Sequence, residues 1–312
     1  MGTPEYAAVS LRQLLTTRHR VRAVVTRPDK PRGRGQKVEA GPVKREAMAA
    51  GIEVLEPASP REEGFIERLK ALHADLGVVV AYGRILPRAA LAAPRLGCIN
   101  AHASLLPRLR GAAPIERAIL AGMTETGVTI MQMNEGLDEG DIILERPIRI
   151  PGTTSGATLR DELANLSAEL LVETIDRFAD YGAAIRRRPQ HHADATFAPP
   201  LRKQEASIHW SEDAHALWLR VRAFSPQPGA FATDRGARLK ILEARFSRLA
   251  HDAAPGTVLG PSDEGLLVAC GTGVLELLVV QPEGKRAMPA LAYERGMKPA
   301  GPRVQRILGN GD

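Results

Sequence analysis

The sequence predicts two domains, an α/β domain with a mostly parallel sheet and then a smaller, mostly antiparallel β domain. Three observations support this division. Strand and helix signals alternate through residues 1–182. A polar, basic, proline-bearing stretch covers residues 183–203, and short β-like runs separated by turns follow in residues 204–312. At 312 residues the chain is long enough for two ordinary domains.

The N-terminal elements follow from apolar spacing. Thr3 and Pro4 are typical of a helix N-cap and first position, and apolar residues at helical spacing continue to Thr17. After that helix, strand and helix signals alternate, as in a sheet covered by helices on both faces. The expected strands are residues 22–26, 52–55, 76–80, 98–100, 128–131 and 141–150, and the expected helices are residues 43–50, 65–72, 114–122 and 159–178.

The first helix begins where a strand is expected. A parallel α/β domain normally enters through a strand that the first helix crosses over, but only Met1 and Gly2 precede Thr3 here. We therefore expect the first strand of the sheet to be missing from this chain. We also expect Met1 to be an internal methionine of a longer natural product.

The C-terminal part has a different pattern. Its β-like runs are residues 237–244, 256–259, 266–269 and 274–280, and a helical pattern near residues 214–223 precedes them. Short strands separated by turns are typical of an antiparallel barrel or sandwich.

Composition excludes several classes of protein. Hydrophobic residues make up 44% and charged residues 25%, which fits a folded protein. No apolar run approaches the ~18 residues of a membrane span. The two cysteines, Cys98 and Cys270, lie far apart in apolar segments, which argues against a disulfide scaffold or a cysteine zinc site. We expect a cytoplasmic protein with no membrane partner.

Most of the net charge of +6 lies in one segment. The residues from Arg27 to Arg45 include seven basic and two acidic side chains. Prolines and glycines punctuate this segment, so it should be a loop. A solvated loop and a contact with a polyanion are both open interpretations of it.

The densest group of unusual polar residues follows an apolar strand. Asn100 and His102 are two apart, so their side chains should project from the same side of the strand. The acidic turn at residues 136–141 is able to bring one carboxylate beside His102. An imidazole, a carboxylate and a carboxamide suit transfer of an acyl-level carbon to an amine, since they handle protons and hold an oxyanion. The alternative is a core histidine and a turn asparagine.

Other signals are weak. Gly33–Gly35 and Gly271–Gly273 lack the remaining glycine of a dinucleotide-binding loop, and no phosphate-binding P-loop is present. His191 and His192 have no supporting metal ligands nearby, and Ser104 lacks the context of a hydrolase nucleophile. We expect no metal cofactor.

The sequence resembles the folate-dependent formyltransferase family, and within it the members that formylate methionyl-tRNA. The loop Ser104–Pro107, followed by Arg110–Pro114, is the most specific match. The other matching segments are Gly2–Tyr6, Thr26–Asp29, Gly33–Gly35, Val78–Gly83, Gly97–Ile115, Thr126–Met133, Gly136–Asp138, Arg222–Phe224, Ala254–Thr257 and Gln281–Lys285.

The resemblance implies a Rossmann-like catalytic domain at residues 1–182, a linker at 183–203 and an OB-like tRNA-binding barrel at 204–312. By matching position, Asn100, His102 and Asp138 are the catalytic residues. The residues implied for binding 10-formyltetrahydrofolate, the co-substrate, are Ser104, Leu105, Leu106 and Pro107. The basic loop matches an insertion that enters the tRNA acceptor end, through Arg32, Arg34 and Lys37.

The resemblance therefore implies formyl transfer to initiator methionyl-tRNA, by a protein that we expect to be a monomer. Two rivals stay open. One is a formyltransferase for another amine, or a hydrolase of the formyl-folate. The basic loop argues against it, because neither reaction requires such a loop. The other is a non-catalytic RNA-binding protein, which would bind tRNA without turning over formyl-folate.

Overall fold

The computed structural model describes residues 1–29, 31–32, 37–296 and 306–311. They fall into two compact units. Unit 1 consists of Met1–Pro114, Glu125–Arg149 and Arg160–Pro199, and unit 2 consists of Ile115–Thr124, Ile150–Leu159 and Pro200–Asp312. Most of the stretch predicted as a linker thus packs within unit 1.

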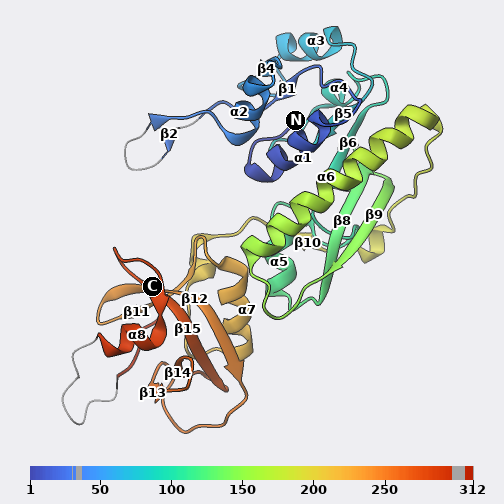
Figure 1. Cartoon of the computed structure of the whole chain (residues 1–312). Helices are drawn as coiled ribbons and strands as arrows, with labels where there is room; N and C mark the ends of the chain where they lie inside the picture. The colour runs from blue at the N-terminus through green and yellow to red at the C-terminus, as the bar shows by residue number, and fades with distance from the viewer. Residues whose placement is uncertain (30, 33–36, 297–305, 312) are drawn as a thin grey trace. The chain divides into compact units, whose positions relative to one another are not determined.

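The main sheet of unit 1 has four strands in the order β5-β6-β8-β9 (Figure 1). They are β5 (Gly77–Val79), β6 (Cys98–His102), β8 (Glu125–Gln132) and β9 (Ile142–Arg149). β5 and β6 are parallel, whereas β6–β8 and β8–β9 are antiparallel. The sheet is therefore mixed, where the sequence predicts a mostly parallel one. β8 and β9 are joined by a turn without a crossover helix, so they can only run antiparallel.

Two parallel strands, β1 (Val24–Val25) and β4 (Val54–Leu55), form a separate pair in the same unit. The smaller strands are β7 (Arg110–Gly111), parallel to β10 (Phe197–Ala198), and β2 (Pro31–Arg32), antiparallel to β3 (Lys37–Val38). Figure 1 shows β2 extending away from the body of unit 1.

The helices of unit 1 are amphipathic and pack on these strands. They are α1 (Glu5–Leu15), α2 (Pro42–Ala49), α3 (Glu63–Ala71), α4 (Arg88–Leu91) and, from Arg160 on, α6 (Gly156–Tyr181), with the 3₁₀ turns η1 (Gly182–Ala184) and η2 (His192–Asp194). α6 runs along the main sheet (Figure 1). Its glutamates Glu169 and Glu173 pair with Arg146 of β9. The core includes Phe65, Leu69 and Leu72 from the α3 region.

Met1 and Gly2 lie between the β1–β4 pair and the main sheet. The Met1 carbonyl accepts from the Val80 N–H at 2.9 Å, and the Gly2 N–H donates to the Val25 carbonyl at 2.9 Å. A cavity of about 570 Å³ continues from this point, lined by residues 20–25 beside β1 and 74–78 beside β5. Apolar side chains of α1 and α3 also line it, among them Leu11, Leu14 and Leu69. This cavity thus lies between the β1–β4 pair and the main sheet.

Unit 2 is an antiparallel sheet in the order β11-β12-β15-β14-β13, with β16 beside β15. Its strands are β11 (Ala230–Asp234), β12 (Ala237–Ser247), β13 (Val258–Pro261), β14 (Leu266–Ala269), β15 (Val274–Pro282) and β16 (Met288–Pro289). Its helices are α5 (Pro114–Leu120), η3 (Lys203–Ala206), α7 (Ala214–Phe224) and α8 (Ala290–Arg295). Among the described strands the pairing follows an open path, so a closed barrel is not seen there.

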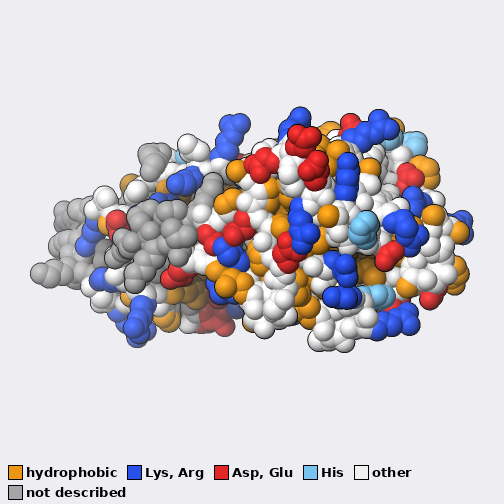
Figure 2. Space-filling view, turned by 90° about the horizontal axis from the view of Figure 1, so that it is seen from above, with side chains coloured by type: hydrophobic (Ala, Val, Ile, Leu, Met, Phe, Trp, Pro, Cys, Tyr) orange, Lys and Arg blue, Asp and Glu red, His pale blue; other side chains and the backbone are white. Residues whose placement is uncertain are grey.

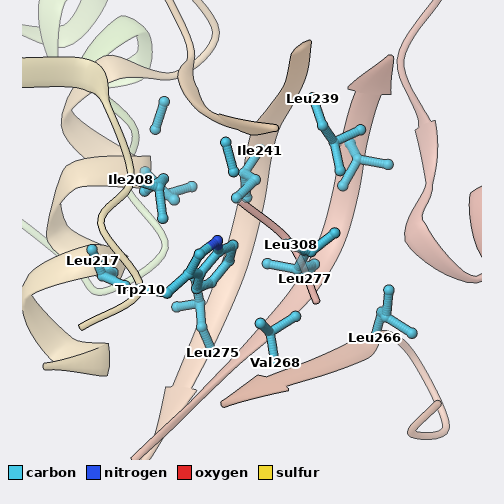
Figure 3. Close-up of a cluster of buried hydrophobic side chains, with 14 of the residues drawn as sticks. Ile208, Trp210, Leu217, Leu239, Ile241, Leu266, Val268, Leu275, Leu277 and Leu308 are labelled. Atoms are coloured by element: carbon cyan, nitrogen blue, oxygen red, sulfur yellow. The ribbon is translucent and has the colours of Figure 1, made fainter. Parts of the chain in front are cut away.

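Trp210 lies within the core of unit 2, with Ile208, Leu217 and Leu275 around it (Figure 3). Its ring is 1% exposed, and its Nε1–H donates to the Gly309 carbonyl at 3.2 Å. The C-terminal segment therefore belongs to the core as well as to the sheet, where Gly309 bridges Thr233 and Ile307 bridges Thr257.

Among the described residues, no helix is both long and apolar enough to span a membrane.

Both cysteines should be chemically inert in the folded chain. Burial raises the pKa of the Cys98 thiol to about 11 and that of Cys270 to about 12. Because the thiolate is the reactive form, iodoacetamide at mildly alkaline pH should leave the native protein unmodified and label both sites after denaturation. Intact-mass measurement detects the adducts. The variant Met48→Cys, at a position 61% exposed, is the positive control, and labelling of native wild-type protein would contradict the expectation.

Candidate functional site

β6 presents Asn100 and His102 on one side of the main sheet. β6 is an inner strand, with Asn100 opposite Val79 of β5 and His102 opposite Thr129 of β8. Because side chains alternate along a strand, residues two apart share a face, as the sequence predicts. Ile99 and Ala101, which alternate with them along β6, are buried on the other face.

Each ring nitrogen of His102 faces an oxygen atom. The side chain is buried, with 6% of the residue exposed. Its Nε2 lies 2.9 Å from the Leu109 carbonyl oxygen, which can only accept, so Nε2 carries the hydrogen. Nδ1 faces Asp138, at 3.7 Å from Oδ2. That separation is longer than a hydrogen bond but within the range of an ion pair.

Asp138 comes from the acidic turn between β8 and β9. Its backbone has φ +51°, a left-handed conformation that side-chain-bearing residues seldom adopt. Its Oδ2 accepts a hydrogen bond of 2.9 Å from the Gly111 N–H in β7. The structure thus brings one carboxylate of this turn to His102, as the sequence suggests.

Asn100 has unused hydrogen-bonding capacity. Its Nδ2 donates to the Val79 carbonyl at 3.2 Å, which sets the orientation of the amide. Its Oδ1 is buried and has no hydrogen-bond partner among the described residues. A buried polar atom without a partner is costly, so a ligand with a suitable donor would be stabilised there.

Thr129 of β8 holds the loop Ser104–Pro107 through two hydrogen bonds. The Thr129 hydroxyl donates to the Ser104 carbonyl at 2.7 Å and accepts from the Leu106 N–H at 3.0 Å. The Ser104 hydroxyl donates to the Arg108 carbonyl at 2.6 Å. The loop therefore has a defined conformation beside the strand end that carries His102.

Several contributors to the site are not evident in the sequence. The Leu109 carbonyl and the Gly111 N–H are backbone groups, which sequence patterns do not reveal. Thr129 carries one signal, a polar residue within an apolar strand. Gln190, which donates to the backbone of the acidic turn, lies in the stretch predicted as a linker.

The residues implied for tRNA binding are only partly described. Arg32 and Lys37 pair across the β2–β3 hairpin, and Arg34 lies outside the described residues. At the base of this segment, Asp29 accepts from the Gly41 N–H at 3.0 Å and from the Lys44 ammonium at 2.6 Å. On the face drawn in Figure 2, basic and acidic side chains are interspersed.

Among the described residues, no group of three or more histidine, cysteine, aspartate or glutamate side chains is placed to hold a metal ion. His191 instead pairs with Asp194, at 3.0 Å.

The chain is similar to known proteins along most of its length. Residues 1–175 match the family described as Formyl transferase, and residues 200–298 match its C-terminal domain. The chain is 46% identical over 296 residues to a methionyl-tRNA formyltransferase from Moorella thermoacetica, covering 95% of this chain and 94% of that protein. A methionyl-tRNA formyltransferase from Stenotrophomonas maltophilia is 49% identical over 292 residues, covering 94% of each.

Among solved structures, the chain resembles an N-formyltransferase from Helicobacter canadensis in complex with folinic acid and dTDP-3-aminofucose. The TM-score is 0.62 at 16% identity, over 88% of this chain and 97% of that one. At that identity the likeness shows the fold alone.

Gly111 should tolerate no side chain. Its φ is +116°, and an added Cβ would lie 2.9 Å from the Ala198 carbonyl oxygen. We expect Gly111→Ala to lower the free energy of unfolding by about 1–3 kcal/mol, measured by urea denaturation. In the control Gly64→Ala, in α3, the new Cβ meets nothing within 4 Å, so stability should hold or rise. Equal stability of the two variants would contradict the strain assigned to Gly111.

Proposed function

This chain belongs to the methionyl-tRNA formyltransferase family, and we propose that it transfers the formyl group of 10-formyltetrahydrofolate to the amino group of initiator methionyl-tRNA. The observation that carries the proposal beyond family membership is the grouping of Asn100, His102 and Asp138. These residues come from β6 and from a turn that follows β8, and they meet at one end of the main sheet.

The donor set fits a formyl-folate. Asn100 has one Nδ2 hydrogen beyond the one given to Val79, and its Oδ1 has no partner. An acyl-level carbon under attack by an amine presents one oxygen acceptor and one nitrogen donor, which match these two vacancies of the amide. We assign Ser104, Leu105, Leu106 and Pro107 to the folate site, next to β6.

The co-substrate supplies a one-carbon group at the acyl level. In the transfer, a bond forms between the amine nitrogen and the formyl carbon, and the bond from that carbon to the folate nitrogen breaks. Asn100 donates to the formyl oxygen as negative charge develops there. Asp138 orients His102, and this pair moves the proton that the amine loses toward the leaving nitrogen. No covalent intermediate with the protein is needed.

Charge and domain organisation support tRNA as the acceptor. We assign Arg32, Arg34 and Lys37 to contacts with the acceptor end, because seven basic and two acidic residues lie between Arg27 and Arg45. The catalytic domain is residues 1–182, the linker 183–203 and the tRNA-binding domain 204–312. Gly309 bridges to Thr233 in the edge strand β11, and Ile307 bridges to Thr257, directly before the other edge strand, β13. A segment that reaches both edges of the sheet supports an OB-like arrangement for that last domain.

We also propose that the sheet has room for one more strand between β1 and β5. The cavity beside Met1 supports this. Residues of β1 and β5 flank the cavity, and apolar residues of α1 and α3 line it. We further propose that the protein acts as a cytoplasmic monomer.

Replacing His102 should slow formyl transfer and leave tRNA binding unchanged. We expect His102→Ala to lower turnover by about 10²–10⁴-fold in a formylation assay with charged initiator tRNA, while tRNA affinity holds. The control His191→Ala removes a histidine whose side chain is 76% exposed and should leave turnover unchanged. Equal turnover of the two variants would remove His102 from the mechanism. Wild-type protein that formylates only another amine, or releases formate, would instead support the enzymatic rivals.

Arg34→Ala should affect the acceptor and leave the chemistry unchanged. Loss of one phosphate contact weakens tRNA binding and reduces the slope of log affinity against log salt concentration by about 1. The control Lys70→Ala removes an exposed cation of α3 and should leave the slope unchanged. Identical salt dependence of Arg34→Ala and wild type would contradict the role of the loop.

A further inference from the structure

Gln190 is a buried residue whose side-chain amide is fully used. It lies between α6 and β10, with 5% of its surface exposed. Its Nε2 donates to the carbonyls of Asp138 at 2.9 Å and Gly140 at 2.8 Å. Its Oε1 accepts from Arg110 Nη2 at 2.6 Å and Nε at 3.1 Å. All four hydrogen-bonding positions of the amide are therefore satisfied.

These contacts join the two segments that hold the Asp138 carboxylate. One segment is the acidic turn, where Asp138 has a left-handed backbone. The other is β7, where Gly111 donates to the carboxylate and its neighbour Arg110 donates to Gln190. Gln190 thus holds the backbone of the turn, while Gly111 holds the Asp138 carboxylate itself.

Arg110 fixes the side-chain oxygen of Gln190 with two hydrogen bonds. The guanidinium is buried, with 3% of the residue exposed, and its remaining neighbours are His192 Nδ1 at 3.4 Å and Glu139 Oε2 at 3.8 Å. The two bonds to Gln190 Oε1 are its shortest. A buried cation makes strong hydrogen bonds, so the orientation of the Gln190 amide is set by Arg110.

The chemistry at this position calls for an amide. It must accept from a cation on one side and donate to two carbonyl oxygens on the other. A carboxylate of the same length accepts from Arg110 but cannot donate to the turn, and an apolar side chain does neither.

We propose that Gln190 is a positioning residue that holds Asp138 against His102. The proposal rests on the function assigned above. Among the described residues no hydrogen bond joins Gln190 to His102 or Asn100, so it acts through the backbone of the acidic turn.

The decisive variant is Gln190→Glu, because it keeps the Arg110 contacts, removes the donors to the turn and sets a carboxylate oxygen against the two carbonyl oxygens there. We expect kcat to fall about 10- to 100-fold, the loss typical of a misplaced catalytic group, with little change in KM for either substrate. Gln190→Met, which is similar in length and lacks both functions, should lower kcat at least as much. The matched control is Gln13→Glu on the exposed face of α1, which should behave as wild type.

A double-mutant cycle separates positioning from a general loss of structure. In an Asp138→Asn background, Gln190→Glu should cost little further kcat, because the group that it positions is already disabled. An equal loss in both backgrounds, or an unchanged kcat in Gln190→Glu, would overturn the proposal.

A second measurement is independent of activity. Native-state hydrogen exchange at the Gly111 amide reports its bond to Asp138. In Gln190→Glu, protection there should fall by about tenfold or more beyond any fall at amides in the middle of β8, which report a general loss of stability. Unchanged protection would overturn the proposal even in an active enzyme. If wild type fails to formylate tRNA while Gly111 protection falls as expected, the function is wrong and the positioning role stands.

Discussion

The hydrogen bond from the Gly111 backbone to the Asp138 carboxylate joins parts of unit 1 that are far apart in sequence. It links β7, which follows the Ser104–Pro107 loop, to the turn between β8 and β9. Through the neighbouring Leu109 carbonyl, the same segment also holds the ring of His102. The proposed chemistry depends on this link, because the carboxylate meets the imidazole only while the loop and the turn are fastened together.

Backbone strain gathers at the same place. Five described residues other than glycine have positive φ, and Leu109 and Asp138, at +60° and +51°, are two of them. Gly111 between these segments has φ +116°. Such conformations are retained when surrounding contacts over-determine them, and here Thr196 bonds the Leu109 N–H while Gln190 bonds the Asp138 carbonyl. Side chains from residues 183–203 thus hold Leu109 and Asp138 in backbone conformations that these two residues do not favour.

Local pattern was enough to predict most elements and the central pair of the site. Alternation along β6 places Asn100 and His102 on one face, and the acidic turn after β8 supplies Asp138, as expected. Strand direction was not predictable in the same way, because apolar spacing is identical in parallel and antiparallel strands, and the sheet is mixed. Gln190 was missed because its burial depends on Arg110, eighty positions earlier in the chain. A polar residue beside arginines and prolines is typical of a linker until that contact is known.

The tautomer of His102 is the most direct test of the arrangement. ¹⁵N chemical shifts of the labelled protein, assigned with a His102→Gln variant, distinguish a protonated from an unprotonated ring nitrogen when the imidazole is neutral. The Leu109 carbonyl requires the hydrogen on Nε2, which leaves Nδ1 toward Asp138. A neutral ring protonated at Nε2 is the predicted result, and a neutral ring protonated at Nδ1 would contradict the geometry on which the proposed catalysis depends.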